Sequence, residues 1–373
     1  MVDPKTFITG LADAGVDFYT GVPDSLLKNF CACLTDTLPS SNYIITANEG
    51  AAVALAAGHF LATQNIPLVF MQNSGIGNAV NPLLSLVDSK VYSLPVVLLI
   101  GWRGEPGVKD EPQHVRQGEV TLPMLESMRI PYTVLSDNEE EALGQAASAV
   151  EEATRRSAPV AIVVRKDTFS KYEIHHPAGE DFPMSREEAL GIVAHNMPDN
   201  AVIVSTTGKL SRELFELRES DNAGHARDFL TVGSMGHASS IALGIALAQP
   251  ERPVYCLDGD GALLMHLGAI TNIGQSGLRN YTHIIFNNGA HESVGAQPTL
   301  ALKLDIPAIA RACGYALAVK VSTPEELVEQ LHAHGDGPRM IEIEVAIRSR
   351  ADLGRPTTTP AQNRDSFMDF LKQ

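Results

Sequence analysis

The sequence predicts two α/β domains in succession, each a doubly wound, mostly parallel sheet covered by helices. Helical and strand patterns alternate along residues 1–168, and the alternation restarts after residue 185. Such a βαβ succession favours parallel sheets with helices on both faces. A chain of 373 residues is long enough for two domains of ordinary size. We therefore expect domains at 1–168 and 185–373, joined by a linker at 169–184.

The hydrophobic periodicity places the individual elements. In the first domain we expect helices at 6–14, 25–34, 50–63, 78–87 and 139–154, and strands at 18–20, 43–46, 68–72, 96–100 and 160–164. Ser185 and Glu188 form a capping-box pattern that predicts the first helix of the second domain. Its strands are expected at 201–205, 229–232, 254–257, 283–286, 318–321 and 341–345, with helices between them, one of which lies between 254–257 and 283–286.

Composition excludes several classes of partner. The formal charge of −16 disfavours nucleic acid and anionic membranes, which attract positively charged surfaces. We see neither an apolar run long enough to span a membrane nor a signal-peptide pattern. The four cysteines, Cys31, Cys33, Cys256 and Cys313, lack a paired metal-binding spacing. We expect reduced core cysteines in a cytoplasmic protein.

The segment 256–299 contains the motif around which we expect the chemistry to be organised. Asp258-Gly259-Asp260-Gly261 follows the predicted strand 254–257, and Asn287-Asn288-Gly289 follows the strand 283–286. Strand ends of this kind hold ligands in open α/β sheets. One carboxylate and one amide oxygen suit Mg²⁺ that is completed by phosphate oxygens and water, which implies a diphosphate partner. The alternative is that these turn-forming residues only make loops.

This pair of motifs resembles the signature of thiamine-diphosphate enzymes. The resemblance implies that Asp260 and Asn288 bind Mg²⁺ through side chains, Ala290 binds it through its carbonyl, and Gly259 and Gly261 lie beside the cofactor. It also implies a pyrimidine-binding first domain and a diphosphate-binding second domain.

Three further segments fit the same resemblance. Glu49, at the start of a small-residue helix, would exchange a proton with the aminopyrimidine; the alternative is a solvated glutamate in the first helical turn. In the second domain, Thr207-Gly208 precede a helix and offer backbone N–H groups to the diphosphate. Gly233-Ser234-Met235 match the place where the cofactor bends over a large apolar residue, although Met235 could equally be core filling.

Within the family, the chain resembles phosphonopyruvate decarboxylases along nearly its whole length, with no middle domain. The resemblance implies decarboxylation of a small anionic 2-oxo acid, 3-phosphonopyruvate, in phosphonate biosynthesis. Candidate substrate or acid–base residues are Asp24, Ser25, Arg103, Lys109, His114, Arg116, His291 and Glu292. We place His114 in a long polar loop.

Alternative interpretations remain at this point. Sulfopyruvate decarboxylase is the near relative, and a carboligase or a non-catalytic partner subunit is less consistent with the motifs. The resemblance also implies a homodimer or higher oligomer, with each active site shared between two chains.

Overall fold

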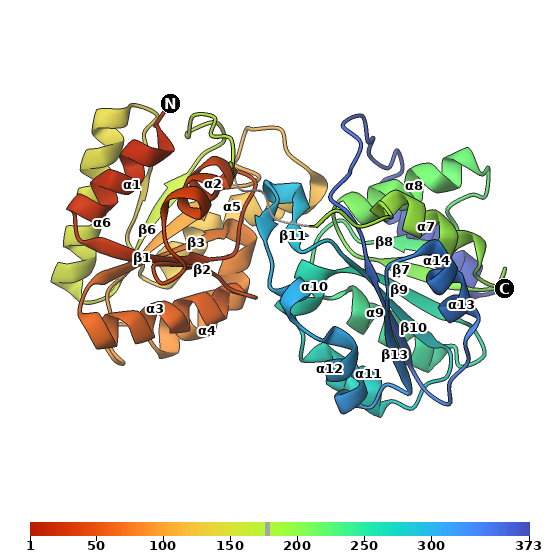
Figure 1. Ribbon diagram of the computed structural model, residues 1–373. Coiled ribbons are helices and arrows are strands. Elements are labelled where there is room, and N and C mark those ends of the chain that lie inside the picture. The colour runs from red at the N-terminus through yellow and green to blue at the C-terminus, as the bar shows by residue number, and fades with distance from the viewer. Residues whose placement is uncertain (176–179) are drawn as a thin grey trace. The chain divides into compact units, whose positions relative to one another are not determined.

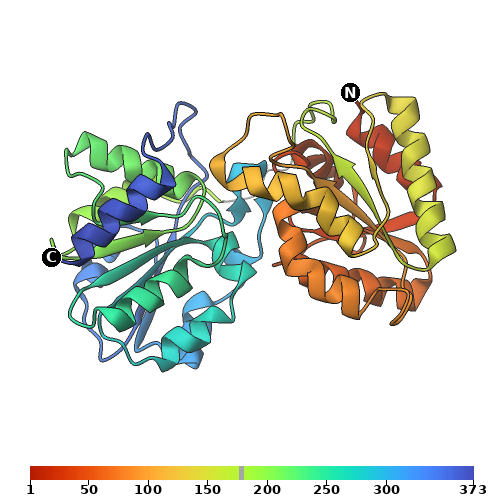
Figure 2. The ribbon, with the colours of Figure 1, turned by 180° about the vertical axis from the view of Figure 1, so that it is seen from behind.

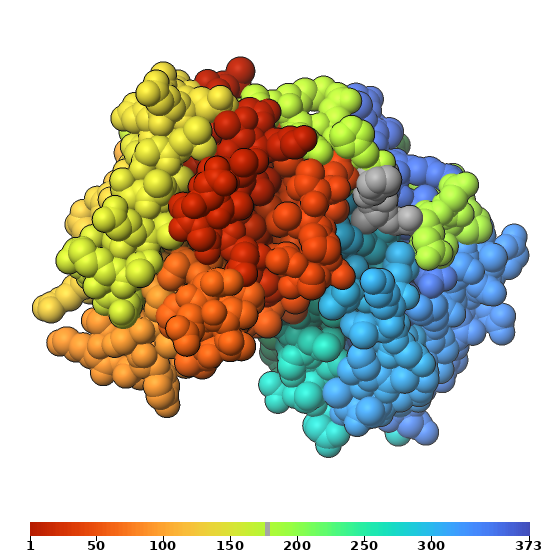
Figure 3. Space-filling model, turned by 60° about the vertical axis from the view of Figure 1, so that its left-hand side comes forward, coloured from red at the N-terminus to blue at the C-terminus, as the bar shows by residue number. Residues whose placement is uncertain are grey.

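This computed structural model contains two six-stranded sheets, one in each half of the chain, and all strands within each sheet are parallel (Figure 1). It describes residues 1–175 and 180–373; the four residues between these ranges are grey in Figure 3. The chain divides into a first unit, Met1–Pro177 with Val294–Gln297, and a second unit, Ala178–Ser293 with Pro298–Gln373. The division falls within the segment 169–184 that the sequence predicts as a linker.

In the first unit the strand order is β2-β1-β3-β4-β6-β5, with every pair parallel. Its strands are β1 (Val16–Gly21), β2 (Tyr43–Ile45), β3 (Ile66–Gln72), β4 (Val96–Gly101), β5 (Tyr132–Val134) and β6 (Pro159–Val164). Its helices are α1 (Pro4–Asp13), α2 (Lys28–Thr37), α3 (Glu49–Thr63), the 3₁₀ turn η1 (Asn73–Gly75), α4 (Ile76–Ser85), α5 (Pro112–Ser127) and α6 (Glu139–Arg156). Helices α1, α2 and α6 pack on one face of the sheet and α3, α4 and α5 on the other, so both faces are buried.

The second unit contains another all-parallel sheet, in the order β13-β14-β10-β9-β7-β8. Its strands are β7 (Val202–Ser205), β8 (Asp228–Leu230), β9 (Val254–Gly259), β10 (Tyr281–Asn287), β13 (Leu317–Val321) and β14 (Arg339–Glu344), with a small pair β11 (Ala290–His291) and β12 (Gln297–Pro298). Its helices are α7 (Arg186–His195), α8 (Lys209–Ser220), α9 (Ala238–Ala248), α10 (Asp260–Met265), α11 (Ala269–Gln275), α12 (Ile306–Cys313), α13 (Pro324–His332) and α14 (Pro360–Leu371), with 3₁₀ turns η2 (Glu292–Val294) and η3 (Ala301–Lys303).

Helices again cover both faces of this sheet. The apolar residues of α7, α8 and α13 form one core cluster with the strands, and those of α9, α11, α12 and α14 form the other. Figure 2 shows α14, in dark blue at the C-terminus, on the side seen from behind.

The two sheets share one topology. If the strands of the second sheet are renumbered with β7 as the first and the sheet is read from its β8 edge, their order is 2-1-3-4-6-5. The first sheet has the same order. The direction of the strand order therefore reverses between β1 and β3 in one unit and between β7 and β9 in the other. Parallel sheets bind ligands outside the carboxyl ends of their strands at such a switch point. The fold thus predicts one binding edge in each unit.

The predicted elements are present, with three differences that concern the site. Helix α5 occupies the stretch interpreted as a polar loop, so His114 lies in a first helical turn. The helical period is hard to recognise in the sequence, because half of the residues of α5 are polar and Pro123 lies inside it. Residues 25–27 precede α2 and do not belong to it. The single helix expected between β9 and β10 is broken at His266 into α10 and α11.

The start of the predicted linker belongs to the first unit. Phe169 is buried against Phe7 and Phe30, and Val2 forms a parallel bridge with it. Residues 176–179 of the predicted linker lie outside the described residues. Across the two described ranges, no helix combines the length and the apolar character needed to cross a membrane.

Candidate active site

The carboxyl edge of the first sheet holds Glu49, the first residue of α3. Asn48 caps this helix by accepting a hydrogen bond from the Ala51 N–H at 2.9 Å, so the position of Glu49 is set by a fixed helix start. The Glu49 side chain is only 4% exposed, and its Oε2 accepts a hydrogen bond from Asn78 Nδ2 at 2.7 Å. Burial raises the pKa of the carboxyl, and the Asn78 amide opposes that rise. A buried carboxyl at this edge is what its predicted proton-transfer role requires.

Asp24 lies at the same edge, just after β1. It is 1% exposed, and its Oδ2 accepts the Leu26 N–H at 2.9 Å. The chain fits around it closely: a Cβ atom on Gly101, at the end of β4, would lie 2.0 Å from Asp24 Oδ2. Burial raises the pKa of Asp24 to about 6, against the Leu26 hydrogen bond and the charge of Arg103. A carboxyl with this raised pKa is partly protonated close to neutral pH.

Arg103 connects the end of β4 to Ser25 and Asp110. Its guanidinium donates from Nε and Nη2 to the two carboxylate oxygens of Asp110, at 2.8 and 2.5 Å, and from Nη1 to Ser25 Oγ at 2.7 Å. Asn73 fixes the Arg103 backbone by donating to its carbonyl and accepting from its N–H, at 2.8 and 3.2 Å. The Arg103 side chain is thus held in one orientation beside Ser25 and Asp24.

Two of the remaining first-unit candidates, Lys109 and Arg116, make no hydrogen bond or ion pair with this cluster among the described residues. Lys109 is exposed in the segment before α5, and Arg116 is an exposed residue of α5 that pairs with Glu119 at 2.5 Å. His114 packs through its backbone, since a Cβ atom on Gly104 would lie 1.9 Å from the His114 carbonyl oxygen. The structure therefore favours Arg103 and Ser25 over Lys109 and Arg116 as the contacts of an anionic substrate.

In the second unit, Asp260 and Asn288 lie at the ends of the adjacent strands β9 and β10, as the sequence predicts. Asp260 begins α10, and both side chains are 4% exposed. Burial raises the pKa of Asp260 to about 7, with a hydrogen bond from Thr299 acting in the opposite direction. The pKa stays raised although the Arg186 charge lowers it slightly, and no cation bonds to Asp260 among the described residues, which fits a ligand of a divalent metal.

Thr299 joins the two halves of the motif. Its hydroxyl donates to Asp260 Oδ2 at 2.5 Å, and its N–H donates to the Gly289 carbonyl at 2.8 Å. The Asn288 amide is also fixed: its Oδ1 accepts the Ala290 N–H at 3.0 Å. These bonds keep Asp260, Asn288 and Ala290 in one arrangement. No sequence signal singles out Thr299, which is 39 residues from Asp260.

Glu292 is buried in a network of donors. It accepts hydrogen bonds from Arg186 Nη1 at 2.6 Å and from Lys209 Nζ, the Ser349 N–H and Asn288 Nδ2, each at 3.2 Å. Burial alone would raise its pKa, but the Arg186 charge and the bonds from Ser349 and Arg186 outweigh burial and lower it to about 2. Glu292 therefore stays ionised. The arrangement suits a counter-ion that holds Asn288, and a carboxylate that stays ionised is less suited to proton transfer than Asp24.

His291 and Met235 meet at the glycine of the metal motif. A Cβ atom on Gly261 would lie 2.7 Å from His291 Cε1 and 3.4 Å from Met235 Cε, so both side chains cover Gly261. Burial lowers the pKa of His291 to about 4, and its imidazole is neutral at physiological pH.

The other predicted cofactor contacts surround the same edge. Gly208 is the N-cap of α8 and follows Thr207 at the end of β7, while Gly233 and Ser234 follow β8. Ser234 has a left-handed backbone (φ 53°), and its carbonyl accepts the His237 N–H at 3.1 Å. The second unit therefore gathers its predicted residues at the switch point between β7 and β9.

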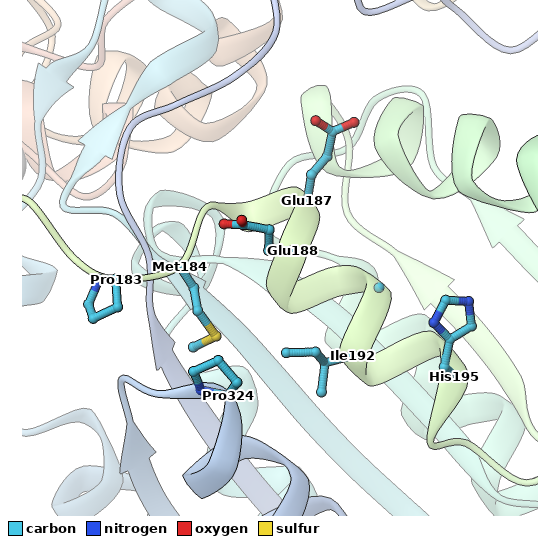
Figure 4. A pocket seen from close by; sticks show the side chains of 8 residues that line it. Pro183, Met184, Glu187, Glu188, Ile192, His195 and Pro324 are labelled. Carbon is cyan, nitrogen blue, oxygen red and sulfur yellow. The ribbon is translucent and has the colours of Figure 1, made fainter.

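A surface pocket of about 460 Å³ lies elsewhere in the second unit. Its lining comes from the residues before α7, from α7 and from Pro324, and Figure 4 shows Met184, Ile192 and Pro324 around it. None of the predicted site residues lines this pocket. Its position gives it no part in the chemistry considered above.

Comparison with known proteins agrees with this geometry. Residues 5–125 match the N-terminal thiamine pyrophosphate (thiamine diphosphate) binding domain of thiamine pyrophosphate enzymes, and residues 206–343 match the C-terminal one. The chain is 33% identical to the phosphonopyruvate decarboxylases of Streptomyces viridochromogenes and Streptomyces hygroscopicus, with each alignment covering 100% of this chain and 95% of the relative. It is 28% identical to the sulfopyruvate decarboxylase of Methanosarcina acetivorans over 86% of this chain and 84% of that relative. The protein belongs to the thiamine pyrophosphate enzyme family.

Proposed function

We propose that this protein decarboxylates 3-phosphonopyruvate to phosphonoacetaldehyde and carbon dioxide, with thiamine diphosphate and Mg²⁺. The observation that carries the proposal is the 33% identity to two phosphonopyruvate decarboxylases along the whole chain. The structure supports it by gathering a metal-binding set in one unit and a buried carboxyl with an arginine site in the other. The metal-binding set would hold the cofactor that decarboxylation of a 2-oxo acid requires, and the arginine site would hold the phosphonate.

The donor set of the second unit fits the metal and the diphosphate. Asp260, Asn288 and the Ala290 carbonyl supply hard oxygen ligands, and the first turn of α8 after Gly208 offers backbone N–H groups to an anion. When bound there, thiamine diphosphate would supply a carbon nucleophile and an electron sink for decarboxylation of a 2-oxo acid. The chain's own task is to bind, orient and exchange protons.

Arg103 and Ser25 are the contacts we propose for the phosphonate. A guanidinium carries five N–H donors, and the bonds to Asp110 and Ser25 use three of them, one each from Nε, Nη2 and Nη1. Two donors therefore remain for an anion. Charge-assisted bonds of this kind suit a phosphonate with two negative charges. Asp110 fixes the orientation of the guanidinium, and Ser25 places a hydroxyl beside it.

Asp24 is the proton-exchanging group we propose for the substrate end of the site. A carboxyl with a pKa of about 6 can take up and release a proton near neutral pH. Glu292 and His291 are less suited, because one stays ionised and the other stays neutral across that range.

Sulfopyruvate decarboxylation is the second candidate. The relative from Methanosarcina acetivorans aligns over 86% of this chain, so its alignment includes parts of both units. The presence of both domains in one chain therefore does not distinguish the two substrates. The higher identity to the phosphonopyruvate decarboxylases, 33% against 28%, favours the phosphonate.

The substrate assignment predicts the outcome of a direct assay. We expect carbon dioxide release from 3-phosphonopyruvate, with thiamine diphosphate and Mg²⁺ present, to have a kcat/KM at least about 10-fold above that from 3-sulfopyruvate or pyruvate. A 10-fold ratio corresponds to about 1.4 kcal/mol of differential stabilisation, which one additional charge-assisted bond supplies. Faster release from 3-sulfopyruvate would transfer the assignment to the second candidate.

The phosphonate site predicts a specific effect of Arg103→Gln. Because a hydrogen bond to a charged group contributes about 1.5–3 kcal/mol, we expect KM for 3-phosphonopyruvate to rise about 10- to 100-fold. Arg103→Lys keeps the charge and should lose less. Arg155→Gln is the control, since Arg155 is an exposed arginine paired with Glu152 on α6. An unchanged KM in Arg103→Gln would exclude Arg103 as the phosphonate contact.

We propose that the working unit is a homodimer, or a higher oligomer, in which each site takes Glu49 from one chain and Asp260 from another. The support is that the two residues lie in different units and that the family resemblance implies shared sites. A two-fold interface closes such an assembly with one self-complementary surface.

Shared sites predict complementation between two inactive variants. A hybrid of Glu49→Gln and Asp260→Ala chains would carry both defects in one site and neither in the other, so each hybrid should approach half the wild-type activity. Native mass spectrometry would establish that hybrids have formed. If verified hybrids show no recovery of activity, each site is built within one chain.

A further inference from the structure

Glu49 is confined from two sides, by Gly75 of η1 and by Asn78 of α4. Helix α3 lies beside α4, as Figure 1 shows. On one side, a Cβ atom on Gly75 would lie 2.3 Å from Glu49 Oε1 and 2.6 Å from its Cδ, so the carboxylate lies directly on the Gly75 backbone. On the other side, Asn78 Nδ2 donates to Glu49 Oε2 at 2.7 Å.

The backbones themselves approach closely at this place. A Cβ atom on Gly50, the residue after Glu49, would lie 2.8 Å from the Asn78 carbonyl oxygen. Glycines at positions 50 and 75 therefore allow the first turn of α3 to lie against η1 and α4. Glu49 is held by both packing and a hydrogen bond, and its carboxylate has little freedom to rotate.

We propose that Gly75 and Asn78 are positioning residues for the acid–base function of Glu49: Gly75 fixes the plane of the carboxylate, and Asn78 holds Oε2 and favours the ionised form. This inference rests on the proposed function, in which Glu49 exchanges a proton with the bound cofactor. Burial stabilises the neutral carboxyl and the Asn78 amide stabilises the charged one, so the balance between the two forms depends on Asn78.

The surroundings of Glu49 contain no competing charge from these elements. Neither η1 nor α4 contains a titratable residue, and the other titratable residue of α3, His59, bonds to Asp17 at 2.9 Å. Within the described ranges, neither an ion pair nor a side-chain hydrogen bond joins Glu49 to another titratable group. Asn78 is thus the side chain whose replacement should shift the Glu49 equilibrium.

The test is the titration of Glu49 in the cofactor-free protein. Carboxyl ¹³C NMR of protein labelled at the glutamate δ-carbon gives the midpoint, and the Glu49 signal is identified by its loss in Glu49→Gln. Asn78→Ala removes the donor, and we expect the midpoint to rise by about 1–2 pH units, the equivalent of one hydrogen bond to a charged group. Asn78→Asp keeps the shape but replaces the amide with a second carboxyl, so the midpoint should rise further.

Asn81→Asp provides the matched control. Asn81 lies on the same helix and is exposed, and its side chain accepts a hydrogen bond only from Ser85 among the described residues. This substitution changes the net charge as Asn78→Asp does, and the Glu49 midpoint should stay within about 0.3 pH units, because an exposed charge is strongly screened. A merely structural role for Asn78 predicts that Asn78→Asp also leaves the midpoint unchanged.

The loaded enzyme gives a second, independent measurement. We expect Asn78→Ala to slow deuterium exchange at the reactive thiazolium carbon roughly 10-fold, between wild type and Glu49→Gln. Unshifted midpoints in both Asn78 variants would overturn the proposal, whatever substrate the enzyme prefers. Shifted midpoints with unchanged exchange would overturn the catalytic part and leave Asn78 as a determinant of ionisation alone. The NMR midpoint and the exchange rate are both measured independently of the substrate assay, which tests the proposed function.

Discussion

The site depends on carboxylates that are kept out of water. Glu49 and Asp260 each begin a helix at the carboxyl edge of a parallel sheet, and each is only 4% exposed. An isolated buried carboxylate is costly, so it must be neutralised, paired or bound to a cation. In this protein neither residue has a cationic partner within hydrogen-bonding distance among the described residues. A proton on Glu49 and a metal ion at Asp260 would each neutralise the buried charge.

The two carboxylates are held in similar ways. In each unit one oxygen accepts a hydrogen bond from a neutral donor, Asn78 for Glu49 and Thr299 for Asp260. A neutral donor fixes the geometry without supplying the positive charge that would lower the pKa strongly. Glu292 is the contrast, because Arg186 and Lys209 surround it and keep it ionised. The same side-chain chemistry therefore serves different purposes according to its neighbours.

The sequence was sufficient to predict the fold class and the position of Asp260 and Asn288 at adjacent strand ends. Alternating periodicity predicts both sheets, and strand-end glycines, Asp260 and Asn288 indicate the ligand edge. The residues that it did not predict act through tertiary contacts: Thr299 reaches Asp260 across 39 positions, and Asn73 reaches Arg103 across 30. Helix α5 was missed because its polar residues and Pro123 obscure the helical period. The ion pair of Glu292 with Arg186, 106 positions away, leaves no local signal, so the sequence indicates Glu292 only as a candidate substrate or acid–base residue.

The identical strand order of the two sheets explains why each unit contributes one half of the chemistry. The switch point is the same in both, but the loops that follow the strands differ, and these loops determine which ligand each edge can hold. In the first unit they present Asp24, Arg103 and Glu49. In the second unit they present Asp260, Asn288 and Thr299. Glu292, which pairs with Arg186 and Lys209, accepts a hydrogen bond from Asn288.

The most direct test of this account is the affinity for thiamine diphosphate at saturating Mg²⁺, measured by titration calorimetry for wild type and Asp260→Ala. Replacing a ligand of the metal should weaken binding at least about 100-fold, since even the residues that orient metal ligands account for 10- to 100-fold. Asp365→Ala, at an exposed aspartate of α14, should bind as wild type does. Unchanged affinity in Asp260→Ala would contradict the metal site and with it the central claim.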